Sequence, residues 1–305
     1  MKAISIFFVF LVCISMVAGY FNVKQYYHLS SLPKKNNITT EDISKAAGVF
    51  KGGIPKKQEI QNKAKDTKPI TSINKLNLKH NDKGIPVLMY HSIGYEKGNT
   101  VRLPKEKFKA QMKYLKDKGY VTLSLDQAYD FFVSNKPVPK KALVLTFDDG
   151  YLDNYVEVFP ILKELDFKAT IFVITDLVGK APGYMNLEQL KELQSNEIDI
   201  ESHTVFHEHL KQLSYEKQLK TLKESKDFLE KSLNKKIHYL AYPYGEYTKE
   251  TLKAVKETGY KMAFTTAGRW SDKTDGVLTL DRVFISGAAN LDVFIERISN
   301  ANYKF

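Results

Sequence analysis

Beyond about residue 84, short β-prone runs alternate with segments whose apolar residues recur at helical spacing. Such alternation is typical of parallel βαβ units. We expect strands at residues 85–90, 121–123, 142–147, 168–174, 198–202, 237–242, 262–265 and 283–285. We expect helices at residues 108–115, 125–133, 151–165 (kinked at Pro160), 187–194, 210–233, 249–258 and 291–298. A closed (β/α) barrel explains this strand count more naturally than an open sheet, and it gathers the C-terminal ends of the strands on one face.

The N-terminal part of the chain has a different composition. Residues 1–21 are almost wholly apolar, which predicts a secretory signal peptide or an N-terminal membrane anchor, and residues 17–19 are small enough for cleavage. Residues 22–83 are rich in Lys, Asn, Ser and Thr without a sustained period, which indicates a flexible spacer. We therefore expect a protein that is secreted or extracytoplasmic, and that is anchored in the membrane if the N-terminal segment stays uncleaved. We expect its ordered domain over residues 84–305.

The positive charge of the chain is concentrated in the spacer. The formal net charge is +11, and residues 20–83 hold 13 Lys and no Arg against 5 acidic residues. A lysine-rich spacer fits attraction to an anionic cell surface or wall polymer better than groove recognition, so we expect no nucleic-acid partner. The single cysteine, Cys13, lies in the first apolar run, so a metal in the ordered domain would need histidine and carboxylate ligands.

Two acids and a glycine follow the expected strand at residues 142–147. Asp148 and Asp149 stand where a parallel α/β fold presents reactive side chains. Placing two carboxylates side by side is costly, because they repel and because a buried acid needs a partner. The alternative is a pair of solvated turn residues before Gly150, since Asp and Gly are common in turns.

Two histidines follow the expected strand at residues 198–202. His203 and His207 are four residues apart and can point their nitrogens at one ion. The alternative is a pair of surface histidines, which is how we interpret the neighbouring His209. Together with Asp149, the two histidines supply three ligands and leave positions open for water and substrate, which is the pattern of a catalytic metal site.

Three segments carry a resemblance to a known family. Residues 146–150 (Thr-Phe-Asp-Asp-Gly), 203–207 (His-Thr-Val-Phe-His) and 242–245 (Tyr-Pro-Tyr-Gly), in this order and spacing, resemble the NodB-type polysaccharide deacetylases, carbohydrate esterase family 4. The resemblance covers residues 84–305, with the NodB core at about 140–305. It implies a distorted (β/α)7 barrel that removes acetyl groups from N-acetylated sugars in chitin, peptidoglycan or poly-N-acetylglucosamine.

The resemblance also implies roles for individual residues. Asp149, His203 and His207 match the metal triad, which usually holds Zn²⁺, although such a site also accepts cobalt, nickel or iron. Asp148 matches the general base. The backbone N–H of Tyr244 would face the oxyanion.

The chain departs from the family pattern at two places. Many members carry an arginine where this chain has Ala241, and many carry a histidine as general acid in a late segment that here, at residues 278–283, has none. We expect Arg282 to replace the missing arginine by pairing with Asp148. Residues 86–93 resemble the subgroup that deacetylates poly-β-1,6-N-acetylglucosamine, in which the histidine matching His91 acts as the acid.

Other functions stay open at this point. The same barrel could carry a catalytically silent glycan-binding protein, or a metal amidohydrolase that acts on small amides. The expected partner is an N-acetylated polysaccharide, and we expect a monomer that associates with a membrane or an anionic wall through its N-terminal part. Trp270, the single tryptophan, could stack on a sugar or fill the core.

Overall fold

The computed structural model describes residues 77–304, so the predicted signal or anchor at residues 1–21 and most of the predicted spacer lie outside the described residues. The described residues begin before residue 84, where we expected the ordered domain to start, and they pack on it. The reason is a long-range contact: β1 (Leu78–Lys79) pairs antiparallel with β6 (Val138–Pro139). Residues 77–83 therefore belong to the domain and not to the spacer. Within the described part of the chain, no helix is long and apolar enough to cross a membrane.

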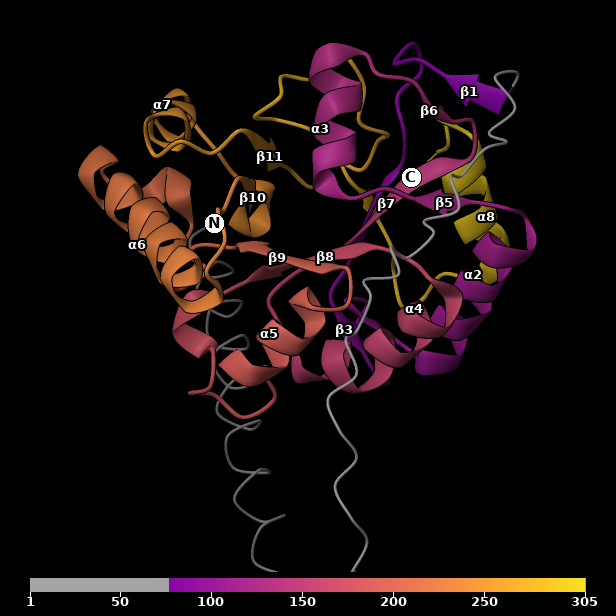
Figure 1. Cartoon of the computed structure of the whole chain (residues 1–305), viewed down its shortest axis with the longest axis horizontal. Coiled ribbons are helices and arrows are strands. Elements are labelled where there is room, and N and C mark those ends of the chain that lie inside the picture. The colour runs from indigo at the N-terminus through magenta and orange to yellow at the C-terminus, as the bar shows by residue number, and fades with distance from the viewer. Residues whose placement is uncertain (1–76, 305) are drawn as a thin grey trace, which may run out of the picture. The chain divides into compact units, whose positions relative to one another are not determined.

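A parallel sheet forms the centre of the domain (Figure 1). Its strand order is β11-β10-β9-β8-β7-β2-β12, and β5 (Val121–Thr122) pairs with β7 off this path. The strands are β2 (Val87–Tyr90), β7 (Ala142–Phe147), β8 (Ala169–Val173), β9 (Ile198–Ser202), β10 (Tyr239–Ala241), β11 (Met262–Phe264) and β12 (Val283–Phe284). Two further short strands, β3 (Ser92–Ile93) and β4 (Arg102–Leu103), pair with each other.

The strands are continuous apolar runs because both of their faces are buried. All of β7 is buried, for example, and its side chains alternate between two clusters. Leu143, Leu145 and Phe147 join the core between the sheet and its outer helices. Ala142 and Val144 join the second cluster, which fills the inside of the curled sheet.

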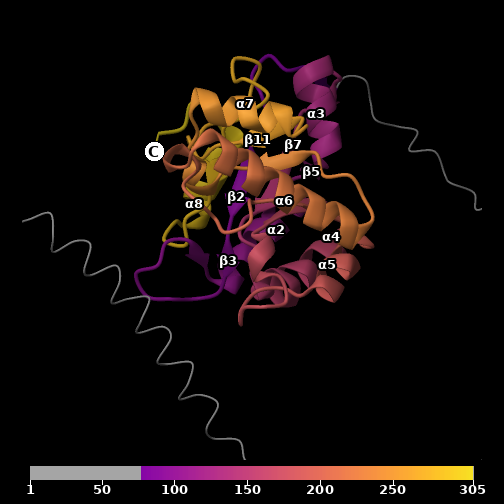
Figure 2. The same ribbon diagram turned by 90° about the vertical axis from the view of Figure 1, so that its left-hand side faces the viewer.

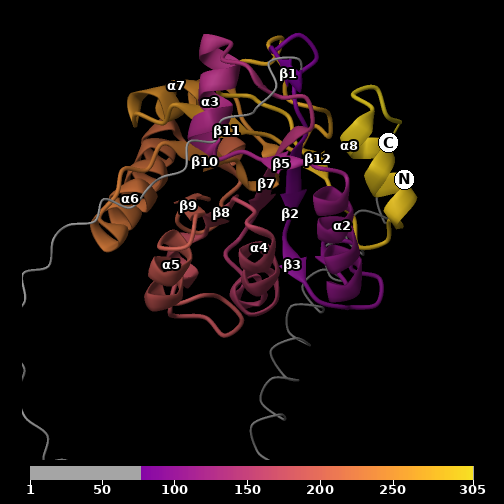
Figure 3. The ribbon, with the colours of Figure 1, turned by 45° about the vertical axis from the view of Figure 1, so that its right-hand side comes forward.

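The helices cover the sheet on its outer side, with one exception. In Figure 1, α4 and α5 lie on one side of β8 and β9, and α3 lies on the other; the rotated views in Figures 2 and 3 agree. Helix α3 packs Leu125, Ala128 and Phe131 into the inner cluster. The helices are α2 (Lys105–Asp117), α3 (Leu125–Ser134), α4 (Phe159–Leu165), α5 (Leu187–Gln194), α6 (Tyr215–Leu233), α7 (Lys249–Glu257) and α8 (Leu291–Ser299).

One segment near the C-terminus links the two edges of the curled sheet. The backbone of Leu280 bonds to β11 on both sides, to Ala263 at 3.0 Å and to Thr265 at 2.8 Å. Three residues later, β12 pairs with β2 at Val283 and Leu88. The structure therefore confirms the expected α/β class and barrel-like architecture, as a parallel sheet curled into a half-barrel.

Two predicted helices differ in detail from the structure. The segment expected to kink at Pro160 contains a π-helical turn, Asn154–Val158, directly before α4. Pro160 has no N–H to donate, and it stands in the first turn of α4. Just before it, the N–H of Phe159 donates to the carbonyl of Asn154 five residues back, which is the π-helical bond. The helix expected from residue 210 begins only at Tyr215, because the Ser214 side chain caps it by accepting the N–H of Lys217.

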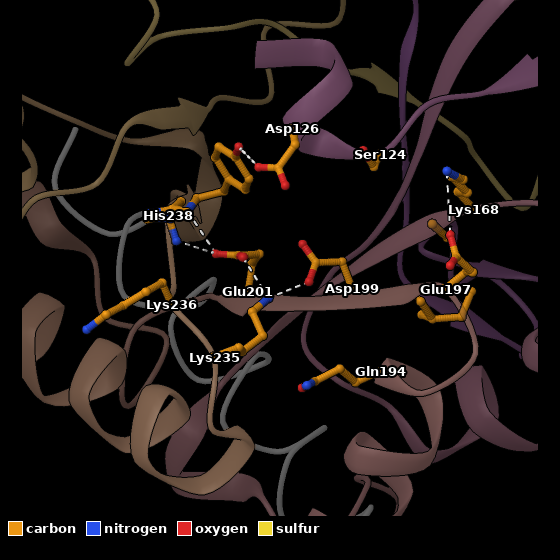
Figure 4. A pocket seen from close by; sticks show the side chains of 13 residues that line it. Ser124, Asp126, Lys168, Gln194, Glu197, Asp199, Glu201, Lys235, Lys236 and His238 are labelled. Carbon is orange, nitrogen blue, oxygen red and sulfur yellow. Dashed lines mark hydrogen bonds and ion pairs between the residues drawn. The ribbon is translucent and has the colours of Figure 1, made fainter. Parts of the chain in front are cut away.

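A cavity of about 390 Å³ opens at the N-terminal ends of β8, β9 and β10, opposite the ends that carry Asp149 and His203. Figure 4 shows Lys235 reaching between Asp199 and Glu201 in this cavity. Glu201 is buried, and burial together with the neighbouring Asp199 raises its pKa to about 8 despite the opposing charge of Lys235. The Glu201 oxygen that is not bonded to Lys235 accepts the backbone N–H groups of His238 and Tyr239, and Glu201 so joins β9 to β10.

This buried pair gives a prediction about stability. Lys235→Met removes the cation that lies between Asp199 and Glu201 and so breaks this buried cluster from one side, and we expect the free energy of unfolding to fall by about 3 kcal/mol. The matched control is Lys236→Met, since Lys236 makes an exposed ion pair with Glu230, and it should change stability by no more than about 0.5 kcal/mol. Urea denaturation measures both. Equal effects of the two variants would contradict the structural role of the pair.

Candidate metal centre

The candidate ligands meet at the C-terminal ends of two parallel strands. Asp149 follows β7, and His203 and His207 follow β9, so both segments emerge at the same edge of the sheet. The His203 Nε2 atom lies 3.4 Å from Asp149 Oδ1, and the His207 Nε2 atom lies 3.6 Å from the same oxygen. One ligand atom from each of the three residues lies within 4.8 Å of the others.

The local backbone bends sharply to bring these side chains together. Asp149 and His207 have φ angles of 76° and 57°, in the left-handed region that non-glycine residues seldom adopt. Thr204, between the two histidines, has a φ of 66°, and its hydroxyl accepts the N–H of His207. The four-residue spacing of the histidines is therefore realised in a tight loop and not on a helix, and backbone strain of this kind concentrates at functional sites.

The donor set fits a divalent cation. Asp149 Oδ1 is buried and has no hydrogen-bond partner among the described residues. The Nδ1 atom of His203 lies 2.7 Å from the Ala241 carbonyl, so the imidazole donates there and keeps the lone pair of Nε2 for the cluster. Burial lowers the pKa of His207 to about 4, which keeps this imidazole neutral and able to ligate.

Asp148 is held differently from Asp149. Its two oxygens accept hydrogen bonds from Arg282 Nη1 and Nη2, both at 2.7 Å, and both side chains are buried. Burial alone would raise the pKa of Asp148, but the Arg282 guanidinium brings it well below its usual range. The pairing that we expected of Arg282 is thus present, and it turns Asp148 into a fixed, ionised carboxylate.

His91 lies beside Asp148 at the end of β2. Its Nε2 atom is 3.9 Å from Asp148 Oδ2, and its Nδ1 atom is buried without a hydrogen-bond partner among residues 77–304. Burial lowers the pKa of His91, although the carboxylates of Asp148 and Asp149 act in the opposite direction. The neutral imidazole is therefore the favoured form at neutral pH.

The side chain of Tyr244 contacts one of the candidate ligands. It lies in the short turn Pro243–Gly245 after β10, with a left-handed φ of 61°. Its ring is 4.5 Å from the ring of His207 and stacks on His209 at 3.7 Å, with 6° between the two planes. From the sequence we expected only the backbone N–H of Tyr244 to face the site, and we interpreted His209 as a surface residue.

The structure brings together every residue that the sequence analysis assigned to the site, and it places Trp270 elsewhere. The indole N–H of Trp270 donates to the carbonyl of Arg297 in α8 at 2.7 Å, and the ring packs against the core. Of the two roles left open for Trp270, these contacts favour core filling. The sequence contained one signal for His209, namely its position two residues after a candidate ligand.

The separate surroundings of the two carboxylates predict separate effects on metal binding. Asp149→Ala should weaken Zn²⁺ binding by more than roughly 100-fold, because it removes a ligand. Asp148→Asn should bind Zn²⁺ within a few-fold of the wild type, because Arg282 holds residue 148 away from the histidines. Titration against a chromophoric chelator measures both affinities. An equal loss in the two variants would refute the division between the two carboxylates.

Comparisons with known proteins agree with this geometry. The family model for polysaccharide deacetylases matches residues 135–263. The chain is 40% identical over 202 residues to YxkH of Bacillus subtilis, a polysaccharide deacetylase by name, covering 66% of this chain and 71% of that protein. It is 32% identical over 174 residues to a poly-β-1,6-N-acetyl-D-glucosamine N-deacetylase of Staphylococcus epidermidis, covering 52% of this chain and 60% of the relative.

Solved structures give the same result for the fold. The deacetylase PplD of Streptococcus pyogenes, in complex with acetate, matches 71% of this chain and 98% of its own, with a TM-score of 0.68 and 34% identity. IcaB from Ammonifex degensii matches 72% of this chain and 97% of its own, with a TM-score of 0.63 and 26% identity. The chain therefore belongs to the polysaccharide deacetylase family, as its three site-bearing segments indicated.

Proposed function

We propose that this protein uses a divalent metal to hydrolyse N-acetyl groups on an N-acetylglucosamine polymer of the cell wall or extracellular matrix, with release of acetate. The observation that carries this proposal is the unequal treatment of two adjacent acids. Asp148 is tied to Arg282, whereas Asp149 turns an unpaired buried oxygen toward two histidines. Amide hydrolysis at a metal needs ligands for the ion and a separate group that acts as base, and the two acids can divide these roles between them.

The cation would be held by Asp149, His203 and His207, and Zn²⁺ suits this set of nitrogen and carboxylate donors best. When bound there, it would polarise the amide carbonyl and acidify a water molecule. Asp148 directly precedes Asp149 in the chain, but Arg282 holds its carboxylate in a separate ion pair. Asp148 would therefore not ligate the ion and could accept a proton from the attacking water.

The proton must then reach the nitrogen of the leaving sugar amine. Asp148 retains a proton poorly, because Arg282 holds its pKa well below the usual range. His91 lies 3.9 Å from Asp148 Oδ2 and is favoured neutral, so it is placed to take up this proton and donate it to the amine. The backbone N–H of Tyr244 would stabilise the oxyanion as the amide carbon becomes tetrahedral.

The relatives support the choice of polymer. Several are poly-β-1,6-N-acetyl-D-glucosamine N-deacetylases of staphylococci, such as one of Staphylococcus aureus that is 28% identical over 202 residues. This polymer and peptidoglycan are the substrates that we favour. Export, and attachment through residues 1–21 and the lysine-rich spacer, remain predictions from composition.

Neither alternative function accounts for the site as well as deacetylation of a polysaccharide does. A silent glycan-binding protein would not need a separate base locked by a buried arginine. A metal amidohydrolase of small amides could use the same groups, but it would not need the lysine-rich spacer that we associate with a wall polymer.

Acetate release tests the proposal directly. The Zn²⁺-loaded protein should release acetate from N-acetylglucosamine oligomers, and a chelator should abolish this activity until Zn²⁺ is restored. An enzymatic acetate assay and mass spectrometry of the products measure it. Hydrolysis of small amides alone would support the amidohydrolase, and glycan binding without acetate release would support the silent protein.

The pair between Arg282 and Asp148 predicts the pH dependence. In Arg282→Met, burial would act on Asp148 without the opposing guanidinium, so its pKa should rise. The base would then be protonated at low pH, and the acidic limb of kcat/KM should move to higher pH by about one unit or more. The control is Arg269→Met, at an exposed arginine, which should leave the profile in place.

A loss of rate in Arg282→Met is not enough to test this prediction, so the whole pH profile must be measured. The kcat/KM should be followed between pH 4 and 9, with the Zn²⁺ content measured at each pH. A uniform loss of activity in Arg282→Met, with an unmoved acidic limb, would contradict the role of Arg282 in keeping Asp148 ionised.

A further inference from the structure

Several aromatic side chains are exposed at the metal end of the domain. They follow the two strands that end beside the site: Phe206 lies between the two histidine ligands, and Tyr244 and Tyr247 follow β10. The exposed fractions are 63% for Phe206, 49% for Tyr244 and 41% for Tyr247. Among them, Tyr244 is the one whose ring also contacts a candidate metal ligand, His207.

The backbone at Tyr244 is fixed by close packing. A Cβ atom on the next residue, Gly245, would come within 2.6 Å of the backbone nitrogen of Thr266, so this turn lies directly against the segment after β11. The Thr266 hydroxyl donates to the Tyr244 carbonyl at 3.3 Å. The tyrosine therefore holds its left-handed backbone because its surroundings leave little freedom.

The ring of Tyr244 is fixed as well. One of its faces is covered by the parallel ring of His209 at 3.7 Å. His209 is held in turn, because its Nδ1 atom lies 2.9 Å from Glu246 Oε2, and the other oxygen of Glu246 accepts from Lys211 Nζ at 2.5 Å. Nearly half of the Tyr244 side chain nevertheless stays exposed.

We propose that Tyr244 is a stacking platform for a pyranose ring of the glycan, next to the sugar whose acetamide enters the metal site, and that His209 and Glu246 are positioning residues for it. This inference rests on the proposed function. A β-linked hexosamine presents a face of C–H groups that packs well on an aromatic ring. A ring already immobilised by His209 loses little conformational entropy when the sugar binds.

The proposed platform predicts an effect that depends on the length of the glycan. A platform beside the reacting sugar contributes only when the glycan extends past that sugar. Its loss should therefore weaken binding of long oligomers more than binding of a single sugar. A ring that merely supports His207 would instead affect metal affinity, and it would affect all chain lengths equally.

The test uses binding, so that it does not depend on turnover. In the Zn²⁺-loaded Asp148→Asn protein, calorimetry would measure Kd for N-acetylglucosamine oligomers of one to five sugars. We expect Tyr244→Leu to weaken binding of the pentamer by about 5- to 10-fold and of the monosaccharide by about 2-fold at most. Tyr244→Phe should rescue pentamer binding, because it keeps the ring.

The positioning residues have their own variants. His209→Ala and Glu246→Gln should each weaken pentamer binding by about 3-fold while Zn²⁺ affinity stays unchanged. The control is Phe228→Leu, at an exposed aromatic residue on α6, which should not change Kd. An equal loss at every chain length, a loss of Zn²⁺ affinity in Tyr244→Leu, or unchanged pentamer binding would each overturn the platform.

Failure of the platform can be told apart from failure of the proposed function. The same oligomers are given to the wild-type protein, and acetate release is measured. If the wild type releases acetate and Tyr244→Leu binds the pentamer normally, the platform is wrong and the deacetylase stands. If the wild type releases no acetate from any oligomer, the proposed function fails, and the platform fails with it.

Discussion

The buried pair between Arg282 and Asp148 connects the closure of the fold to the chemistry of the site. Arg282 belongs to the segment that bonds to β11 at Leu280 and to β2 at Val283, so it stands where the two edges of the curled sheet meet. Its guanidinium also donates to the Thr265 carbonyl at 3.0 Å. A buried ion pair of this kind is costly to break from one side, by about 3–5 kcal/mol. The segment that closes the sheet therefore also holds Asp148, the proposed base.

This constraint explains how two neighbouring carboxylates can take the different roles that we propose for them. Adjacent acids would ordinarily repel and share their environment. Here the guanidinium neutralises Asp148, and the left-handed backbone of Asp149 turns the second carboxylate toward His203 and His207. Many family members carry an arginine at the position of Ala241 in β10, whereas Arg282 comes from the segment directly before β12. Arg282 makes the pair with Asp148 that we expected in place of the missing arginine.

The sequence predicted the sheet well, because buried parallel strands are apolar runs. It also singled out side chains at the strand ends that the structure brings close together. It missed β1, since a two-residue strand depends on its distant partner β6. It started α6 too early, because the Ser214 cap and not the apolar pattern decides where that helix begins. It did not predict the contacts of His209 with Tyr244 and Glu246, because no local spacing reveals them.

The central claim is that Arg282 keeps Asp148 out of the metal coordination sphere, so that one acid ligates and the other acts as base. A crystal structure of the Zn²⁺-loaded protein, with the ion located by anomalous scattering, tests this claim most directly. It should show Zn²⁺ at about 2.0–2.2 Å from Asp149, His203 and His207, with Asp148 still paired to Arg282. Coordination of Zn²⁺ by Asp148, with its pair to Arg282 broken, would contradict it.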